Sequence, residues 1–506
     1  MDKRLTLAIA LSLLVLLTWS VLTPKPQIIG NKEVATGTVQ AQGPSILSQP
    51  LVPNPAVPEI VTETVRFVQG NRELIFNPAK ADILEVIFKD KLEHRLPLKT
   101  GFLTNDDLLF KQLSKTSDTF SFIYEDQNKR IIKKYSIPNN SNVIELEIQV
   151  KNLSSIPLLL NSQLVLGKLN LSAKNSQSRY QDVLFGGKEK TVHLGAGKNY
   201  RSQDVKFIGL RDQYFCAIVE PVEDIAVSAY VKKINQDESE VGLFMKEVSV
   251  QPGIQIGHSF RIYLGPQDLK ILNNIKPEWT SIIFFGTFDI IAQILLQLLG
   301  FFYGLVHNWG LAIILLSIAV YLVLFPLSIK QMRSMKEMQA LQPKIEALRK
   351  DLKDNPQRLN KEIMELYKEH KVNPLSGCLP LLLQMPIFFA LYQALIRSTA
   401  LRGAEFLWIK DLSSPDKLFV LKNSIPLLGN QVNILPVLMA IGMFVQQKIS
   451  MVKATGDAAQ QQKMMLIIMP VMFGVIFYQM PSGLVLYWFV NSILMLSYQF
   501  RINTQK

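Results

Sequence analysis

The chain has 506 residues, of which 48% are apolar and only 19% charged, whereas an ordinary soluble protein has about 25% charged residues. With a mean hydropathy of +0.18, this composition excludes a disordered or fibrous chain and argues against a purely soluble enzyme. The formal net charge is +13, for which nucleic-acid binding, anionic lipid and membrane topology are three different explanations.

The positive charge is concentrated toward the C-terminus. Residues 1–60 hold 4 basic and 3 acidic residues, residues 61–275 hold 28 and 25, and residues 276–506 hold 22 and 13. Eleven of those last 22 basic residues lie between Lys330 and Lys371, flanked by long apolar runs. A nucleic-acid-binding domain would interleave its basic residues with polar and aromatic ones, so the pattern favours the positive-inside rule of membrane proteins.

The N-terminus has the form of a membrane anchor. A short basic start precedes an apolar run of 18 residues, 5–22. The apolar core of a signal peptide has about 7–15 residues and ends at a small-residue cleavage site, whereas this run ends at Thr18-Trp19-Ser20. We predict an uncleaved anchor over residues 1–23 with its N-terminus in the cytoplasm; a cleaved signal peptide is the alternative.

A linker and a β domain are predicted next. Residues 24–60 contain seven prolines among Gln, Gly, Ser and Thr, a composition typical of a flexible linker. Residues 61–275 alternate apolar and polar side chains in short runs separated by Gly, Pro, Asn and Asp. This predicts a large antiparallel β-sandwich, which lies outside the cytoplasm if the anchor is oriented as above. Its histidines are scattered, and we find no clustered catalytic residues or metal-ligand spacing in it.

From Trp279 onward the apolar pattern becomes helical. Residues 281–307 are apolar except for Asp289, Gln293 and Gln297, which recur every four residues and predict a helix lying in the membrane interface. A transmembrane helix is the alternative for this segment. Five transmembrane spans are predicted after it, each near the length needed to cross a bilayer, at 309–328, 379–396, 432–448, 464–479 and 483–500.

Counting the anchor gives six spans and fixes the topology. Residues 330–375 and both termini are then cytoplasmic, and residues 397–430 face outward. The basic residues agree, with 11 in the first cytoplasmic segment and 5 in the outward one. If 281–307 also crossed the membrane, the basic block would face outward, and the charge bias argues against that.

Residues 330–371 predict a cytoplasmic helical hairpin. Apolar residues recur at three- and four-residue spacing, and Asp354-Asn355-Pro356 breaks the helix in the middle. This is the pattern of a short antiparallel coiled coil with basic outer faces. The hairpin is either purely structural or a docking arm for ribosomes or targeting factors. The candidate docking residues are Lys330, Arg333, Lys336, Lys344, Arg349 and Lys350.

The predicted spans carry polar residues without charge. No Asp, Glu, His, Lys or Arg lies in the middle of a span, which argues against a proton-coupled transporter. Ser317 and Tyr321 share one helix face, as do Tyr487 and Asn491. Such residues either bond neighbouring helices or line a wet cavity.

Several motifs in this half resemble the YidC family of membrane protein insertases. They are residues 308–316 (NWGLAIILL), Phe325-Pro326-Leu327, residues 372–389 (VNPLSGCLPLLLQMPIFF) and residues 481–487 (PSGLVLY). The resemblance implies a polytopic α-helical membrane protein whose five core spans surround a hydrophilic groove, together with the periplasmic β-sandwich of Gram-negative members. The groove is open to cytoplasm and lipid and closed to the outside.

The resemblance also implies the function. A member of this family inserts and helps to fold proteins of the bacterial inner membrane, alone or with the Sec translocon. It is not an enzyme and needs no cofactor or metal. Its partners are nascent membrane proteins, the Sec translocon, ribosome or signal recognition particle components, and the phospholipid bilayer. A small-solute transporter with an external domain and a structural scaffold are the alternatives.

One position departs from the family. Aligned by Asn308-Trp309-Gly310, the arginine that the family places in the groove, four residues after Ser317, is Tyr321 here. We therefore expect a neutral groove. The residues that we expect to line it are Ser317, Tyr321, Gln384, Tyr487, Trp488 and Asn491.

Overall fold

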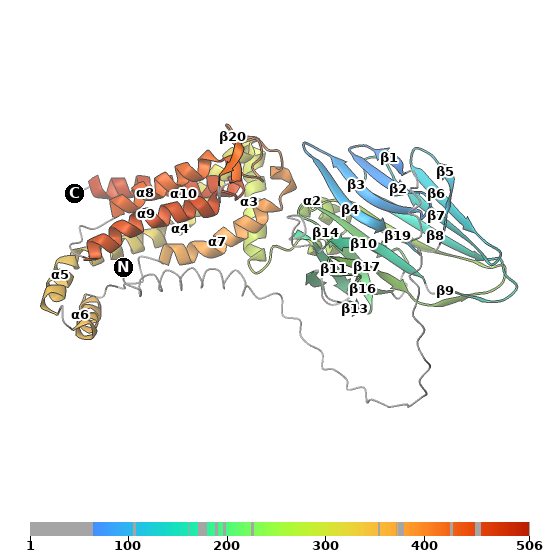
Figure 1. Cartoon of the computed structure of the whole chain (residues 1–506), viewed down its shortest axis with the longest axis horizontal. Helices are drawn as coiled ribbons and strands as arrows, with labels where there is room; N and C mark the ends of the chain where they lie inside the picture. The colour runs from blue at the N-terminus through green and yellow to red at the C-terminus, as the bar shows by residue number, and fades with distance from the viewer. Residues whose placement is uncertain are drawn as a thin grey trace, which may run out of the picture.

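The computed structural model describes residues 64–104, 108–160, 162–170, 180–187, 191–195, 199–223, 227–352, 355–370, 372, 379–425, 429–450 and 457–504. The predicted anchor (1–23) and linker (24–60) lie outside these residues. In the part described, an N-terminal β domain and a C-terminal helical bundle occupy opposite ends of an elongated molecule (Figure 1).

The β domain is built from antiparallel strands, as predicted. A nine-stranded sheet has the order β12-β11-β14-β15-β19-β8-β7-β6-β5, and two four-stranded sheets have the orders β1-β2-β3-β4 and β10-β17-β16-β13. The strands are β1 (Val65–Gln69), β2 (Arg72–Asn77), β3 (Asp82–Lys89), β4 (Glu93–Gly101), β5 (Lys111–Lys115), β6 (Thr119–Glu125), β7 (Lys129–Ser136), β8 (Val143–Asn152), β9 (Leu158–Leu160), β10 (Gln163–Asn170), β11 (Asp182–Gly187), β12 (Thr191–Gly195), β13 (Tyr200–Ser202), β14 (Val205–Arg211), β15 (Phe215–Pro221), β16 (Val227–Lys233), β17 (Glu238–Met245), β18 (Val248–Val250) and β19 (Gln255–Pro266).

Alternation along the strands sets the core of this domain. In β8, Ile144 and Leu146 are fully buried, while the residues between them face outward. They lie opposite Ile262 and Phe260 of β19, which are also fully buried. Each such side chain contributes roughly 1.5–3 kcal/mol when it leaves water, so one face of the nine-stranded sheet forms the hydrophobic core.

Helices dominate the rest of the chain. Its elements are α2 (Leu269–Ile275), η2 (Pro277–Ile282), α3 (Asp289–Val306), α4 (Trp309–Ala340), α5 (Gln342–Asp351), α6 (Pro356–Glu369), α7 (Leu379–Ile396), η4 (Thr399–Leu401), β20 (Phe419–Ile425), β21 (Gly429–Val432), α8 (Ile434–Ser450), α9 (Asp457–Phe477) and α10 (Ser482–Thr504). Figure 1 shows α4, α7, α8, α9 and α10 running along the long axis, with α3 crosswise at the end that meets the β domain.

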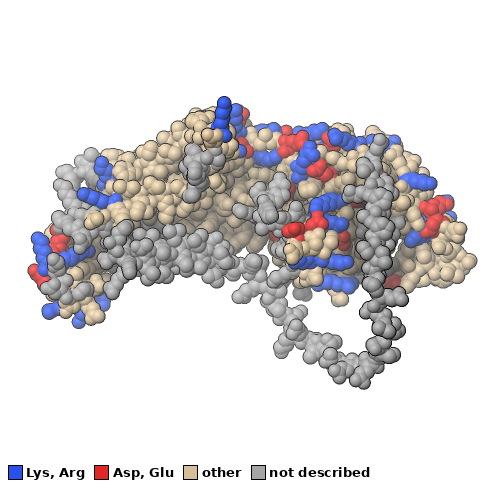
Figure 2. Space-filling view, viewed as in Figure 1, with Lys and Arg blue, Asp and Glu red and all other residues tan. Residues whose placement is uncertain are grey.

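By length and composition, three segments of the described helices are able to cross a membrane: Asp289–Val306, Trp309–Ile329 and Ser482–Arg501. Shorter apolar stretches are Gln384–Ile396, Ile434–Ile449 and Lys463–Phe477. The number of spans therefore stays a prediction. On the face shown in Figure 2, the surface over these helices carries few charged side chains, whereas charged side chains of both signs lie on the hairpin and on the β domain. The uncharged surface matches the part of the molecule that a bilayer would cover.

The β domain and the bundle are joined by direct contacts. Both guanidinium Nη atoms of Arg402, which follows η4, donate to the carbonyl oxygens of Leu92 and Glu93, at 2.8 and 2.7 Å. Gln213, in the turn before β15, donates to the carbonyl oxygen of Ile396 at the end of α7, at 2.8 Å. One hydrophobic cluster also continues from the sheet through η2 and α3 into the bundle. The two regions therefore share a core.

The hairpin differs from its prediction in one detail. Helix α4 runs without a break through Pro326 to Ala340, and the first arm of the hairpin then restarts as α5 after Leu341. Pro343 explains the restart, because proline lacks the N–H that a continuous helix would use there. Leu341, Ile345 and Val372 form the small core of the hairpin.

Candidate functional site

Three helices of the bundle bring the predicted groove residues together. Gln384 of α7 donates from Nε2 to the hydroxyl oxygen of Tyr487 on α10, at 2.6 Å. Tyr487 is fully buried, whereas Gln384 is half-buried. A hydrogen bond between two helices in an apolar bundle fixes their spacing, because the buried Tyr487 hydroxyl is out of reach of water.

Tyr321 lies on α4 and contacts α10 at a different level. Its hydroxyl is 3.5 Å from the carbonyl oxygen of Leu494 on α10, a long hydrogen bond. The ring is half-buried and lies 5.7 Å from the ring of Phe325 on the same helix. Tyr321 therefore reaches α10 at about two turns from Tyr487.

Two of the predicted residues bond their own helix. The hydroxyl of Ser317 donates to the carbonyl oxygen of Ile313 at 2.8 Å, and the Asn491 amide donates to the carbonyl oxygen of Tyr487 at 2.9 Å. Such bonds to the residue four positions earlier satisfy a polar side chain inside an apolar helix. Ser317 is completely buried, and its hydroxyl bonds its own helix.

Trp488 lies in a different environment from the other five residues. Its indole packs among the rings of Phe388 on α7 and Phe473 and Phe477 on α9, with centroid distances of 5.5, 5.9 and 5.3 Å. It thus joins α10 to α7 and α9 through aromatic contacts. The polar junction consists of Gln384, Tyr487 and Asn491, and Tyr321 contacts α10 separately at Leu494.

The end of the bundle nearer the β domain, where β20 lies (Figure 1), holds a polar network that the sequence did not predict. Asn433 donates to the backbone oxygen of Tyr478 at 2.6 Å, and the Tyr478 hydroxyl donates to the Gln431 carbonyl oxygen at 3.0 Å. One carboxylate oxygen of Asp416 accepts bonds from Trp408 and from the first N–H groups of α8. Asp416 is far from α8 in sequence, so only the folded chain reveals it as the cap. These bonds tie the segment between α7 and α8 to the helix ends.

The hairpin exposes its basic side chains. Arg333, Lys336, Lys344, Arg349 and Lys350 are exposed to solvent. Arg333 pairs loosely with a glutamate four residues later, at 3.6 Å, and Lys344 lies 3.0 Å from the ring of His370.

Lys330 lies on α4, and its side chain is outside the described part. Within the described residues, no group of three or more His, Cys, Asp or Glu is placed to hold a metal.

Comparison with known proteins identifies both halves. Residues 301–506 match the family model of the 60Kd inner membrane protein, and residues 89–298 match that of the YidC periplasmic domain. The membrane protein insertase YidC of Geotalea daltonii is 33% identical over 99% of this chain and 99% of its own length. The protein of the same name from Pelobacter propionicus is 36% identical over 74% of this chain and 70% of its own.

A crystal structure of an active YidC insertase with its first transmembrane domain resolved is 20% identical, with a TM-score of 0.42. The similarity covers 86% of this chain and 92% of that one. The relative from Geotalea daltonii, aligned from end to end, is sufficient to assign the family. This chain belongs to the YidC family of membrane protein insertases.

Proposed function

We propose that this protein inserts proteins into the bacterial inner membrane and helps them to fold, using a neutral groove between α4, α7 and α10. The names of its relatives support the activity. The observation that carries the groove is the junction of Gln384, Tyr487 and Asn491, with the Tyr321 hydroxyl about two turns further along α10. Hydrogen-bonding groups without charge line up there in an otherwise apolar bundle.

The groove would act on the desolvation of the substrate. Moving a polar segment from water into hydrocarbon without hydrogen bonds costs about 2–7 kcal/mol for each amide or hydroxyl group. Amide and hydroxyl groups along the groove would replace part of the lost water while the substrate's apolar helix moves against the flanking helices. Gln384 and Asn491 each carry both donors and an acceptor, so they can bond any peptide backbone.

Tyr321 gives this groove its particular chemistry. Where the family has an arginine, a tyrosine can offer one hydroxyl and an aromatic face but no charge. The groove then favours polar, uncharged segments and has no electrostatic attraction for acidic ones.

The proposed topology places both termini and the hairpin in the cytoplasm and the β domain in the periplasm. The 11 basic residues between Lys330 and Lys371 support this orientation. In the same orientation, the network of Asp416, Asn433 and Tyr478 would close the groove on the periplasmic side. Helix α3 would lie in the outer interface, since it runs crosswise to the other helices (Figure 1).

The hairpin would provide the contact with ribosomes or signal recognition particle components. Its exposed basic residues Arg333, Lys336, Lys344, Arg349 and Lys350 suit a polyanionic surface. For substrates with several spans we propose cooperation with the Sec translocon.

The test is replacement of Tyr321 in cells depleted of the wild-type protein. Tyr321→Ala should impair insertion of a small two-span substrate with a polar, uncharged translocated segment, whereas the matched control Tyr321→Phe, which keeps the ring, should lose less. Crosslinking from position 321 to the nascent chain would show the contact directly. Normal insertion by Tyr321→Ala at normal expression would refute the role of this residue. Normal insertion without the protein would instead favour a transporter or scaffold.

A further inference from the structure

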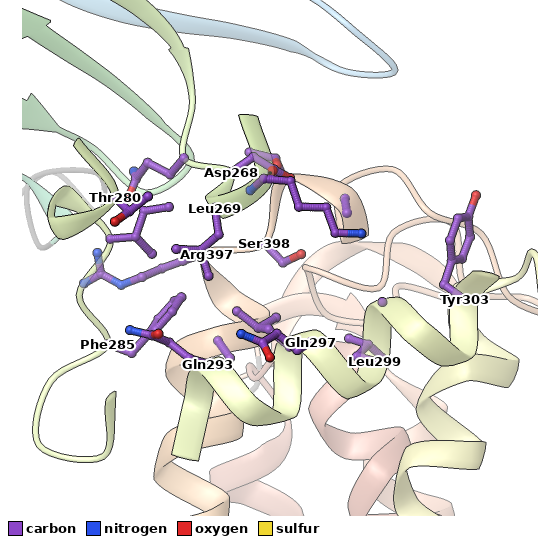
Figure 3. Close-up of a pocket in the computed structure, with 18 of the residues that line it drawn as sticks. Asp268, Leu269, Thr280, Phe285, Gln293, Gln297, Leu299, Tyr303, Arg397 and Ser398 are labelled. Carbon is purple, nitrogen blue, oxygen red and sulfur yellow. Dashed lines mark hydrogen bonds between the residues drawn. The ribbon is translucent and has the colours of Figure 1, made fainter. Parts of the chain in front are cut away.

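A cavity of about 700 Å³ lies where the β domain, α3 and the outer ends of α4 and α7 meet. Its walls come from α2, residues 280–285, the polar face of α3, Trp309 and residues 397–400 (Figure 3). The walls from α2 to Trp309 are consecutive in the chain, whereas residues 397–400 follow α7, so folding is required to close the cavity. It is separate from the groove, because none of the six predicted groove residues lines it.

Arg397 lies in this cavity with part of its guanidinium unused. Its side chain crosses the cavity toward Thr280 and Phe285 (Figure 3), and its guanidinium carbon lies 5.7 Å from the ring centroid of Tyr180. The Nε and Nη1 atoms are shielded from solvent, yet they have no hydrogen-bond partner among the described residues. A buried donor without a partner costs about 1–3 kcal/mol, and more when it is charged. The position therefore indicates a ligand that supplies acceptors.

The nearby carboxylates are already used. Asp182 accepts a bond from Arg211 at 2.9 Å, and Asp268 caps α2 by accepting from the Lys270 N–H at 2.8 Å. Burial lowers the pKa of Arg397 to about 10, helped by the like charge of Arg211, so Arg397 stays protonated at neutral pH. The ligand that fits the cavity is thus an anion.

The facing wall adds neutral polar groups. Gln293 and Gln297 project from α3 toward Arg397 and Ser398 (Figure 3). The sequence placed these glutamines in a stripe facing water, but the structure turns them toward a protein cavity. Gln293 already donates from Nε2 to the carboxylate of Asp289 at 2.8 Å. Its second amide hydrogen and the Gln297 amide suit the ester and glycerol oxygens of a phospholipid headgroup.

An apolar surface borders this polar wall. Ile290, Ile294, Phe301 and Leu305 form a stripe on α3, with exposed fractions of 76%, 57%, 61% and 61%. Ile294 directly follows Gln293, so this stripe lies about 100° around the helix from the polar one. A single ligand that has an anionic group and hydrocarbon chains could occupy both places. Its anionic group would lie in the cavity, and its chains would lie along Ile294 and Phe301.

We propose that this cavity binds the headgroup of an anionic phospholipid from the outer leaflet, with its phosphate on Arg397 and its acyl chains along the apolar stripe of α3. The assignment to the outer leaflet rests on the topology proposed above. Bound there, the lipid fixes the depth of α3 in the membrane and holds the β domain against the bilayer surface.

The test measures lipid retention by the purified full-length protein. Native mass spectrometry compares dioleoylphosphatidylglycerol with dioleoylphosphatidylcholine, which has the same chains and a phosphate but no net charge. We expect each wild-type protein to retain one more molecule of phosphatidylglycerol than of phosphatidylcholine. Arg397→Gln should bind phosphatidylglycerol at least about tenfold more weakly than wild type. Lys422→Gln, which removes an exposed charge from β20 outside the cavity, should match wild type.

Three results would overturn the proposal: equal phosphatidylglycerol binding by wild type and Arg397→Gln, equal retention of the two lipids by wild type, or full displacement of the lipid by glycerol 1-phosphate. The last would indicate a site for small soluble anions. If Arg397→Gln does not fold, Gln293→Leu serves in its place, and binding equal to wild type would again contradict the proposal. No insertion substrate is present, so lipid binding can fail while insertion, assayed separately, is intact.

Discussion

The β domain and the helical bundle bury polar groups in opposite ways. In the β domain, the ammonium group of Lys133 is completely buried and donates to two backbone carbonyls, and buried His94 lies 2.6 Å from Asp212. In the middle of the described bundle helices, the buried polar groups are uncharged, as in Ser317 and Tyr487. A buried charge requires fixed partners, whereas a neutral hydrogen-bonding surface can exchange them. The bundle thus has the property that a site for many different substrates needs.

Lys133 provides the largest expected effect on stability. Its Nζ donates hydrogen bonds to the carbonyl oxygens of Ala81 and Phe102, each at 2.7 Å. Both of those residues have positive φ angles. Lys133→Met leaves the Phe102 carbonyl oxygen without this donor, whereas the Ala81 carbonyl oxygen keeps its bond from the Tyr135 hydroxyl at 2.8 Å. We therefore expect a loss of about 2 kcal/mol in the free energy of unfolding of the β domain. Chemical denaturation of the full-length protein, followed by hydrogen–deuterium exchange of the backbone amides of β3 and β7, measures this loss. Unchanged stability would show that the buried charge is not needed.

The same residue predicts a pH dependence. Burial lowers the pKa of Lys133 to about 7, whereas the unfolded lysine titrates near 10.4. Between these values the unfolded state binds more protons, so the contribution of Lys133 to stability rises with pH and is smallest below about pH 7. The difference in stability between wild type and Lys133→Met should therefore grow between pH 7 and 10. Because all other groups are common to both proteins, a constant difference would contradict the lowered pKa.

A substitution of Gln384 tests the role of uncharged hydrogen bonds inside the bundle. Gln384→Leu removes the bond between α7 and α10 and leaves the buried Tyr487 hydroxyl without this partner. Bonds of this kind between membrane helices contribute about 0.6–2 kcal/mol, so we expect a loss of about 1 kcal/mol in the bundle and slower insertion of substrates with polar segments. Gln393→Leu, on the same helix, keeps the bond and is the matched control. Equal insertion by both variants would exclude Gln384 from the groove.

Local patterns explain what the sequence predicted. Strand alternation, as in β8, predicted the antiparallel β domain, because period-two burial depends only on neighbouring residues. The break at Asp354-Asn355-Pro356 agrees with α6, which begins at Pro356 with Asn355 as its N-cap. The stop at Leu341 was missed because the apolar stripe continues across it, although Pro343 was a visible signal.

Contacts between distant segments explain what could not be predicted. The partners of Asp416 at the start of α8, and the cavity shared by Gln293 and Arg397, join residues that no periodicity connects. The sequence also could not predict that Trp488 lies within an aromatic cluster while Tyr487 beside it lies at the polar junction. Neighbouring residues on a helix face different directions, and the packing of the other helices decides what each one meets. Which polar side chains face a cavity depends on how the helices pack.

A substitution of Tyr321 has the smallest expected effect on the stability of the folded protein. It is also the most direct test of whether the absence of charge in the bundle matters. Tyr321→Arg would place the family's charge in a groove whose described neighbours are neutral. Most of the attraction for an acidic segment would be offset by desolvation, so we expect a net gain of about 1 kcal/mol, or about fivefold faster insertion of substrates with acidic translocated tails. The gain should shrink at high salt and be absent for neutral tails and in the uncharged control Tyr321→Gln. If acidic and neutral tails gain equally, the added arginine acts through packing, and the absence of charge does not determine which substrates this groove accepts.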